Sequence, residues 1–517
     1  MSKFIKGTFI LLAAGLVTRV LGFIYRIVLA RSIGEEGVGL YMMAYPTFIL
    51  VVTLVQLGLP VAISKNVAEA EAKGNFAEIK KILVVSLAIT ISLAVILTPL
   101  LILLAPLLSS TLFTDQRTFY PLIAITPAIP IIAVSSVLRG YFQGRQNMQP
   151  SAISQILEQV IRITLIAVVT KAFLPYGIEY AAAAAMAASV LGELVSLIYL
   201  LTTFKLKKHF RLRKNFFTFV QSGKSTFNNL MSIALPTMGS RMIGSVSWFF
   251  EPIVVAHSLA IAGVIAVDAT KQYGALTGYA MPLLMLPSFI TFSLATSLVP
   301  AISEANSRNH YKLIQYRLEQ ALRFVFLSGG LAVVILYVLA EPLMELMYGS
   351  TKGSSFIRLM APFFIIYYFQ GPLQAVLQAL NLARAAMINS LIGAAVKTAV
   401  IFVLASQPPF GITGAALGIM VGFVLVTFLH LATVFKKVSF TIHVRDYVKG
   451  FLIIGVTGTI GYWIIHHIIP SEPLVTKVLI ALASMTFIYT LLLLLFGLIK
   501  RNDVSRIPWL GKFITRN

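Results

Sequence analysis

Long apolar runs, separated by short polar breaks, recur from one end of the chain to the other. Each holds about twenty residues, enough for a helix to cross roughly 30 Å of hydrocarbon. Runs such as 82–108 do not alternate as the strands of a lipid-facing β-barrel would. The pattern predicts an all-α integral membrane protein with 14 transmembrane helices. They are residues 8–31, 38–63, 82–108, 119–142, 151–174, 178–204, 227–256, 273–300, 319–340, 356–378, 387–406, 412–434, 447–469 and 475–499.

Composition agrees with this pattern. Hydrophobic residues make up 58% of the 517 residues and charged residues only 11%. Soluble domains carry about 25% charged residues, so this chain has too few polar side chains to coat several soluble domains. The composition therefore favours a chain that is embedded in lipid along its whole length.

The positive charges are unevenly distributed between alternate loops. A net charge of +23 would suggest nucleic acid as the partner of a soluble protein. Here, with the N-terminus placed inside, about four times as many Lys and Arg fall on the inner side as on the outer side. This bias predicts a multi-pass protein of the cell (inner) membrane with both termini in the cytoplasm. It explains the charge without a nucleic-acid partner.

The sequence repeats itself at a spacing of about 235 residues. At 235, Arg162 matches Lys397; at 234, residues 175–178 match 409–412; at 222, residues 18–22 match 240–244. Each copy would hold six helices, an even number, so both copies would face the same way. We therefore expect two pseudo-symmetric six-helix lobes plus two C-terminal helices.

This repeat predicts four segments. They are an N-terminal six-helix lobe (1–204), a basic cytoplasmic linker (205–226), a C-terminal six-helix lobe (227–434), and two additional helices with a basic cytoplasmic tail (435–517). Two parallel lobes typically enclose a cleft and work by alternating access. The alternative is a membrane scaffold that arose by duplication and does not transport.

Four ionisable residues fall inside the first and seventh predicted helices: Arg19, Arg26, Arg241 and Glu251. Arg19 and Arg26 are seven residues apart and share a helix face, and Arg241 is the repeat equivalent of Arg19. Charges at membrane depth are costly unless they are paired or line a wet cavity. Because guanidinium groups suit phosphate oxygens, these residues are candidates for binding an anionic, phosphate-bearing substrate. The alternative is an internal Arg–Glu network that holds the bundle together.

A second set of charges forms a possible polar seam: Glu158, Arg162, Lys397 and Glu193. Glu158 and Arg162 are four residues apart on one helix and are expected to pair. Glu193 has no partner on its own helix, so it either carries a proton or bonds a neighbouring helix. Arg139 lies near a predicted cytoplasmic helix end, where we expect it to extend towards water.

Nothing in the sequence indicates catalysis, a metal site or another cofactor. Cysteine is absent and the seven histidines are scattered, so thiolate chemistry and zinc–sulfur sites are excluded. The sequence contains no Walker-type phosphate loop. We expect a protein that is not an enzyme, needs no cofactor and does not itself hydrolyse ATP.

Four strings give the chain a wider resemblance. Residues 33–43, 139–144, 248–255 and 370–381 resemble sporulation members of the polysaccharide-export branch of the multidrug/oligosaccharidyl-lipid/polysaccharide exporter superfamily. The resemblance covers nearly the whole chain. It implies a role in polysaccharide biosynthesis, namely spore cortex peptidoglycan synthesis during sporulation, and a relationship to the MurJ lipid II flippases.

The MurJ-like resemblance also implies a role for one arginine. Residues 19–23 match an Arg-Val-Leu-Gly-Phe motif whose arginine lines a central cavity for a lipid-linked pyrophosphate, and that role carries over to Arg19. A second family arginine falls where this chain has Tyr25, with Arg26 one residue further. The flippases also use arginines in helices two and eight, which lack such charges here. Arg241 and Glu251 are candidates to substitute for them.

Together these observations predict a flippase that moves a lipid-linked anionic saccharide, most simply a peptidoglycan precursor, across the lipid bilayer by alternating access. Cortex-synthesis enzymes are possible partners, and a membrane surrounding the forespore is a possible location. Two alternatives stay open. One is a drug or cation antiporter of the same superfamily, which needs an acidic cavity. The other is a non-transporting membrane scaffold for cortex synthesis.

Overall fold

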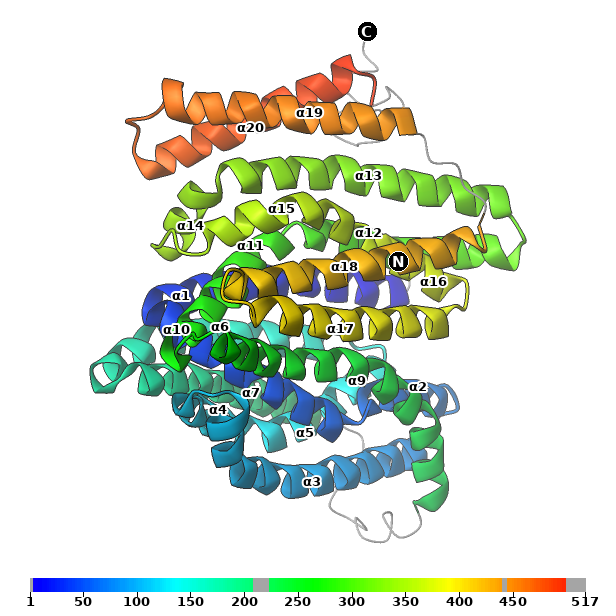
Figure 1. Cartoon of the computed structure of the whole chain (residues 1–517). Helices are drawn as coiled ribbons and strands as arrows, with labels where there is room; N and C mark the ends of the chain where they lie inside the picture. The colour runs from blue at the N-terminus through cyan, green and yellow to red at the C-terminus, as the bar shows by residue number, and fades with distance from the viewer. Residues whose placement is uncertain (1–2, 208–222, 439–443, 499–517) are drawn as a thin grey trace. The chain divides into compact units, whose positions relative to one another are not determined.

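The computed structural model of the protein describes residues 3–207, 223–438 and 444–498, which form helices and connecting turns (Figure 1). The helices are α1 (Lys3–Gln56), α2 (Leu59–Ala72), α3 (Phe76–Leu107), η1 (Leu108–Leu112), η2 (Gln116–Thr118), α4 (Phe119–Ile125), α5 (Ala128–Gly144), α6 (Gln149–Phe173), η3 (Leu174–Tyr176), α7 (Ile178–Lys207), α9 (Lys224–Ile261), α10 (Ala266–Tyr273), η4 (Gly274–Ala280), α11 (Met281–Met285), α12 (Ser288–Ser307), α13 (Tyr311–Val338), α14 (Ala340–Tyr348), α15 (Ser354–Tyr368), α16 (Gln370–Ala379), α17 (Ala383–Ala405), α18 (Gly411–Phe435), α19 (Val444–Trp463), η5 (Ile464–Ile468) and α20 (Leu474–Leu495).

Thirteen helical stretches of the described residues are long and apolar enough to cross a membrane. The first, Ala14–Ala72, has 59 residues and is long enough for two crossings. Its helix α1 bends at Gly34, where φ is 65° and ψ is −176°. Glycine adopts this backbone conformation without a steric penalty. The all-helical membrane architecture is confirmed, and the number 14 stays a prediction.

The predicted helix 273–300 is interrupted in the structure. It is divided into the end of α10, the π-helix η4, the short α11 and the start of α12. Pro282 is the second residue of α11, and Pro287 directly precedes α12. Proline lacks the backbone N–H that an uninterrupted helix requires, which explains why the hydrophobic pattern was continuous while the helix is not.

The chain packs into two compact units, each described here by itself. Unit 1 comprises Met1–Tyr279 and Ala394–Gly418, and unit 2 comprises Ala280–Gly393 and Ile419–Asn517. The predicted segments 1–204, 205–226, 227–434 and 435–517 stay a prediction. Most of the basic linker (208–222) and the whole basic tail after Leu498 lie outside the described residues.

The core of unit 1 is built where α2 packs against α5. Leu59, Ile63 and Val67 of α2 meet Tyr141 and Phe142 of α5, and all five side chains are at most 1% exposed. The backbones lie close together because Gly140 and Gly144 face α2. A Cβ at either glycine would lie within 3 Å of a carbonyl oxygen of α2. Small residues allow such close approach in membrane helix pairs.

Unit 2 has a comparable core of α12, α13, α16 and α18, and α19 and α20 pack beside α13 in the same unit. The Tyr489 hydroxyl on α20 donates a hydrogen bond to the Leu327 carbonyl oxygen at 2.9 Å. Gly450 of α19 faces the ring of Phe326, which a Cβ would meet at 2.2 Å. The two C-terminal helices are therefore packed specifically onto the preceding lobe.

At the end of unit 1 where α1 bends, α10 is held tightly against α1. A Cβ at Gly39 would lie 2.1 Å from the carbonyl oxygen of Thr270. Conversely, a Cβ at Gly274 would lie 2.2 Å from the carbonyl oxygen of Glu35. The two backbones are in direct contact, so neither position has room for a side chain.

A cluster of ion pairs lies at the same end of unit 1. Asp115 accepts hydrogen bonds from Arg117 Nη2 and Thr270 Oγ1, both at 2.8 Å. Arg117 also pairs with Glu36, whose other oxygen lies 3.4 Å from Lys271 Nζ. Burial raises the pKa of Asp115, but the hydrogen bonds from Arg117 and Thr270 lower it more, so the pKa lies below its usual value. The cluster joins α1, η2 and α10 through charge-assisted hydrogen bonds.

We expect Gly39→Ala to destabilise the protein, because the new Cβ forces α1 away from α10. Gly22 lies on the same helix with no atom within 4 Å of its Cβ position. Gly22→Ala is the matched control and should be neutral or stabilising by up to about 1 kcal/mol. Thermal unfolding of the purified variants in detergent measures both. Equal midpoints for the two variants would contradict the packing described.

We expect Asp115→Asn to cost about 1–3 kcal/mol near neutral pH, because the amide replaces a charged acceptor of several hydrogen bonds. A carboxyl group whose pKa is lowered on folding contributes stability above its unfolded pKa and loses it as the pH falls through the folded pKa. The difference between wild type and variant should therefore shrink below about pH 4. Unfolding midpoints measured across pH test this, and a difference that grows on acidification would refute it.

Candidate functional site

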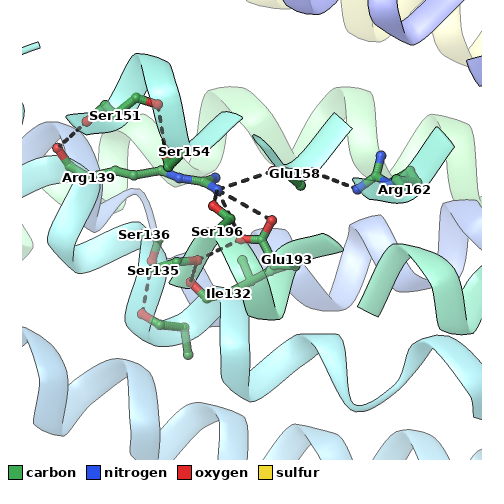
Figure 2. Close-up of polar contacts among 11 residues, drawn as sticks. Ile132, Ser135, Ser136, Arg139, Ser151, Ser154, Glu158, Arg162, Glu193 and Ser196 are labelled. Carbon is green, nitrogen blue, oxygen red and sulfur yellow. Dashed lines mark hydrogen bonds and ion pairs between the residues drawn. The ribbon is translucent and has the colours of Figure 1, made fainter. Parts of the chain in front are cut away.

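Four charged side chains from three helices of unit 1 meet inside the bundle (Figure 2). We call Arg139 of α5, Glu158 and Arg162 of α6, and Glu193 of α7 the polar quartet. Their side chains are 18%, 12%, 14% and 5% exposed, respectively. Arg162 Nη2 lies 2.6 Å from Glu158 Oε1, four residues away on the same helix. The expected pairing within α6 is present.

Arg139 joins this pair to α7. Its Nη2 atom lies 3.2 Å from Glu158 Oε2 and 3.2 Å from Glu193 Oε1. The same nitrogen donates to Ser196 Oγ at 2.9 Å, and the Ser135 hydroxyl donates to Glu193 Oε1 at 2.7 Å. Figure 2 shows these contacts converging from α5, α6 and α7. One guanidinium group therefore holds three helices together.

This arrangement corrects one expectation and shows one of the two alternatives that stayed open for Glu193. Arg139 does not extend to water at a helix end; it turns inward, because two carboxylates are available there. Glu193 has its partners on α5, so it bonds a neighbouring helix. The sequence signal for this pairing was weak: Glu193 lacked a partner three or four residues away, which implied a partner from another helix without naming it.

An aromatic chain leads from the quartet to α9. The Arg162 guanidinium carbon lies 5.6 Å from the centre of the Tyr25 ring on α1. Tyr25 meets Tyr41 edge-on, Tyr41 stacks on Tyr45, and Tyr45 meets Trp248 of α9 at 5.8 Å between ring centres. The rings thus connect α6, the two arms of α1 on either side of Gly34, and α9.

A separate ion pair joins α9 to α17 in unit 1. Lys397 Nζ lies 2.7 Å from Glu251 Oε2, and the two side chains are 12% and 11% exposed. Sequence reasoning placed Lys397 with Glu158 and Arg162, and Glu251 with the arginines. The structure instead pairs Lys397 with Glu251, although the two residues are 146 positions apart.

The three candidate arginines lie on α1 and α9. Arg19 and Arg241 are exposed and Arg26 is half-exposed. Arg241 Nη1 donates to Gln56 Oε1 of α1 at 3.4 Å. Arg26 makes no hydrogen bond or ion pair with the residues that the structure describes. Along α1, Arg26 lies about 12 Å and Arg19 about 22 Å before the bend at Gly34.

The arm of α1 after Gly34 packs against α9, since Thr53 of α1 hydrogen-bonds Ser245 of α9 at 3.0 Å. Glu251 lies about 15 Å along α9 from Arg241 and forms an ion pair with Lys397. Arg26 and Arg241 therefore have no carboxylate partner within the described residues. Within the described residues, no group of three His, Asp or Glu side chains is arranged to hold a metal ion.

Comparison with known proteins identifies the family. The model of the family described as "Polysaccharide biosynthesis protein" matches residues 4–306, more than half of the chain. The chain belongs to this polysaccharide biosynthesis family. A second model, MatE, matches residues 275–404.

The chain is similar to two curated proteins over most of its length. The chain is 60% identical over 513 residues to stage V sporulation protein B of Bacillus subtilis (strain 168), covering 99% of each chain. It is 25% identical over 415 residues to lipid II flippase MurJ of the same organism, covering 77% of this chain and 76% of that protein. The expected resemblance to sporulation proteins and MurJ is confirmed.

Solved structures show the same fold. Lipid II flippase MurJ in an inward closed conformation aligns with a TM-score of 0.70 at 16% identity, covering 94% of this chain and 98% of that one. An inward-facing multidrug resistance MATE family transporter aligns with a TM-score of 0.69 at 16% identity, covering 81% and 96%. Family and fold together make this polysaccharide biosynthesis protein a multi-pass, flippase-like membrane transporter rather than an enzyme.

The Glu251–Lys397 pair predicts strong non-additivity. Glu251→Met or Lys397→Met alone leaves one buried charge without its partner, which should cost about 3–5 kcal/mol. The double variant replaces the pair with apolar side chains and should recover most of that loss. Thermal unfolding of the three variants in detergent forms the double-mutant cycle. Additive losses would show that the two side chains do not depend on each other.

Proposed function

We propose that the chain moves a lipid-linked, phosphate-bearing saccharide from the inner to the outer leaflet by alternating access, and that the saccharide is a peptidoglycan precursor for the spore cortex. The supporting observation is the contrast between two kinds of charge in the spanning helices. The carboxylates Glu158, Glu193 and Glu251 all have basic partners, whereas Arg26 and Arg241 form no ion pair within the described residues.

Unpaired guanidinium groups inside apolar helices need water or an anion. Arg26 and Arg241 are such groups, and Arg19 lies on the same arm of α1 as Arg26; the other arm of α1 packs against α9, which carries Arg241. Each guanidinium group can donate two parallel hydrogen bonds to a phosphate, so three of them suit a pyrophosphate better than a drug cation. The charge distribution therefore favours an anionic substrate over the cation antiporter.

The relatives supply the biological setting. A close relative is named for stage V of sporulation, and another is named lipid II flippase. On this proposal the protein lies in the cell membrane, or in a membrane surrounding the forespore, with both termini in the cytoplasm. Cortex-synthesis enzymes on the outer face would then consume the translocated precursor.

Reconstitution tests the proposal directly. Purified protein is placed in liposomes with a lipid-linked peptidoglycan precursor that carries a fluorescent head group, and an impermeant quencher reports its leaflet. Arg26→Ala and Arg241→Ala should reduce translocation by at least about tenfold each, because each removes a charge-assisted contact of roughly 1.5–3 kcal/mol.

Arg308→Ala is the control, since Arg308 is 65% exposed and pairs only with nearby Glu304 in the described structure. Its translocation rate should equal that of the wild type. Drug or cation exchange without lipid translocation would overturn the proposal in favour of an antiporter. A scaffold is indicated if neither lipid nor cation moves while the arginine variants still support cortex formation.

A further inference from the structure

The polar quartet is not explained by the proposed substrate site. It contains two carboxylates and two guanidinium groups from three spanning helices, and all four side chains are 18% exposed or less. Placing four charges there is expensive, even when they are paired. Their geometry and their distribution between the two sequence copies indicate what they do.

One guanidinium nitrogen lies among four oxygens at the centre of the quartet. Arg139 Nη2 carries two hydrogens. Within 3.4 Å it has Glu158 Oε2, both oxygens of Glu193 and the oxygen of Ser196. The Ser135 hydroxyl donates to Glu193 Oε1 at 2.7 Å, whereas the Nε atoms of Arg139 and Arg162 are buried without a hydrogen-bond partner in the described structure.

The two carboxyl groups are also close to each other. Each has an oxygen 3.2 Å from the same nitrogen, so these oxygens lie at most about 6.4 Å apart. Like charges at such a separation, shielded from water, favour the binding of a proton by one of them. A proton on either carboxyl group adds a hydrogen-bond donor between the two groups.

The second sequence copy shows that the helix crossing does not need these charges. At the repeat spacings of 235 and 234, Glu158 corresponds to Gly393, and Gly192 corresponds to Val426. In the first copy a Cβ at Gly192 would lie 2.8 Å from the Glu158 carbonyl oxygen. In the second copy a Cβ at Gly393 would lie 2.0 Å from Val426 Cγ2. At this helix crossing the close approach is made by a glycine of α7 in the first copy and by a glycine of α17 in the second.

The remaining acidic position is also neutral in the second copy, because Glu193 corresponds to Thr427. Arg139 corresponds to Gln374, and only Arg162 keeps a basic equivalent, Lys397. The fold therefore forms this helix contact without a carboxylate pair. The two acids belong to a task that only the first copy performs.

We propose that Glu158 and Glu193 form a proton-binding site: one proton is held between the two carboxyl groups and is taken up from water and released again in each transport cycle. No other bond is made or broken. The groups that face the site are Arg139 of α5, Arg162 of α6 and Tyr25 of α1, followed by Tyr41, Tyr45 and Arg26 of α1. Coupling of this proton to substrate movement rests on the proposed function.

Infrared spectroscopy of the purified full-length protein tests the site without any substrate. The expected result is a carboxylic-acid carbonyl band that appears and disappears reversibly with pH. Glu158→Gln and Glu193→Gln should each abolish the titration of this band. Glu71→Gln, which removes a carboxylate paired with Arg145 at 2.7 Å in the same unit, should leave it intact.

Glu193→Gln keeps the shape of the protonated side chain and leaves Arg139 its contact with Glu158, so it provides a folded variant if Glu158→Gln does not fold. Size-exclusion chromatography and circular dichroism verify folding. The proposal is overturned if no band titrates while the protein stays folded, or if the titration survives both substitutions. The quartet would then be a permanently ionised structural network.

Translocation in liposomes separates this proposal from the proposed function. Wild-type transport of the lipid-linked precursor should change with an imposed pH gradient, and transport by Glu193→Gln should not respond to the gradient. If the unmodified protein moves no precursor, the proposed function fails while the infrared result still stands. If precursor moves at a rate that ignores the gradient, the coupling of the proton site fails.

Discussion

The cost of placing a charge inside a hydrocarbon layer governs the arrangement of this protein. An unpaired ionic group at membrane depth costs several kcal/mol, so every such residue must have a compensating partner, water or a function. The structure meets this requirement in different ways. The quartet and the Glu251–Lys397 pair neutralise charge between helices, and the Asp115 cluster does so where the helices end. Arg26 forms no ion pair and belongs to no charge cluster within the described residues.

The contacts that compensate these charges also hold the helices of unit 1 together. Arg139 binds carboxylates of α6 and α7, and Arg162 extends from α6 to the Tyr25 ring of α1. The ring chain continues through Tyr45 to Trp248 of α9, the helix that carries Arg241. The helices bearing the candidate arginines are therefore packed through the same aromatic chain that touches the quartet. A change in the charge of the polar quartet would alter the contact of Arg162 with Tyr25, and through it the packing of these helices.

Local patterns in the sequence were sufficient to predict the helical membrane fold and the Glu158–Arg162 pair, because both depend on neighbours along one helix. They did not predict the ion pairs that depend on packing between helices. Glu193 and Arg139 are 54 residues apart, and Glu251 and Lys397 are 146 apart. Hydropathy also carried the predicted helix 273–300 across η4 and two prolines, since an apolar run does not show where a backbone hydrogen bond is lost. The bend at Gly34 was likewise visible only as a break between two apolar runs.

Comparing corresponding residues of the two sequence copies distinguishes those that the helix packing requires from those that serve the proposed function. The contact of Glu158 with Gly192 and that of Gly393 with Val426 are equivalent crossings, one with a carboxylate and one without. Arg19 and Arg241, by contrast, are shared by both copies. A site that must hold the same anion from either side of the membrane benefits from matching groups on both copies. A site that takes up a proton needs carboxylates on only one copy, which is the distribution that the chain carries.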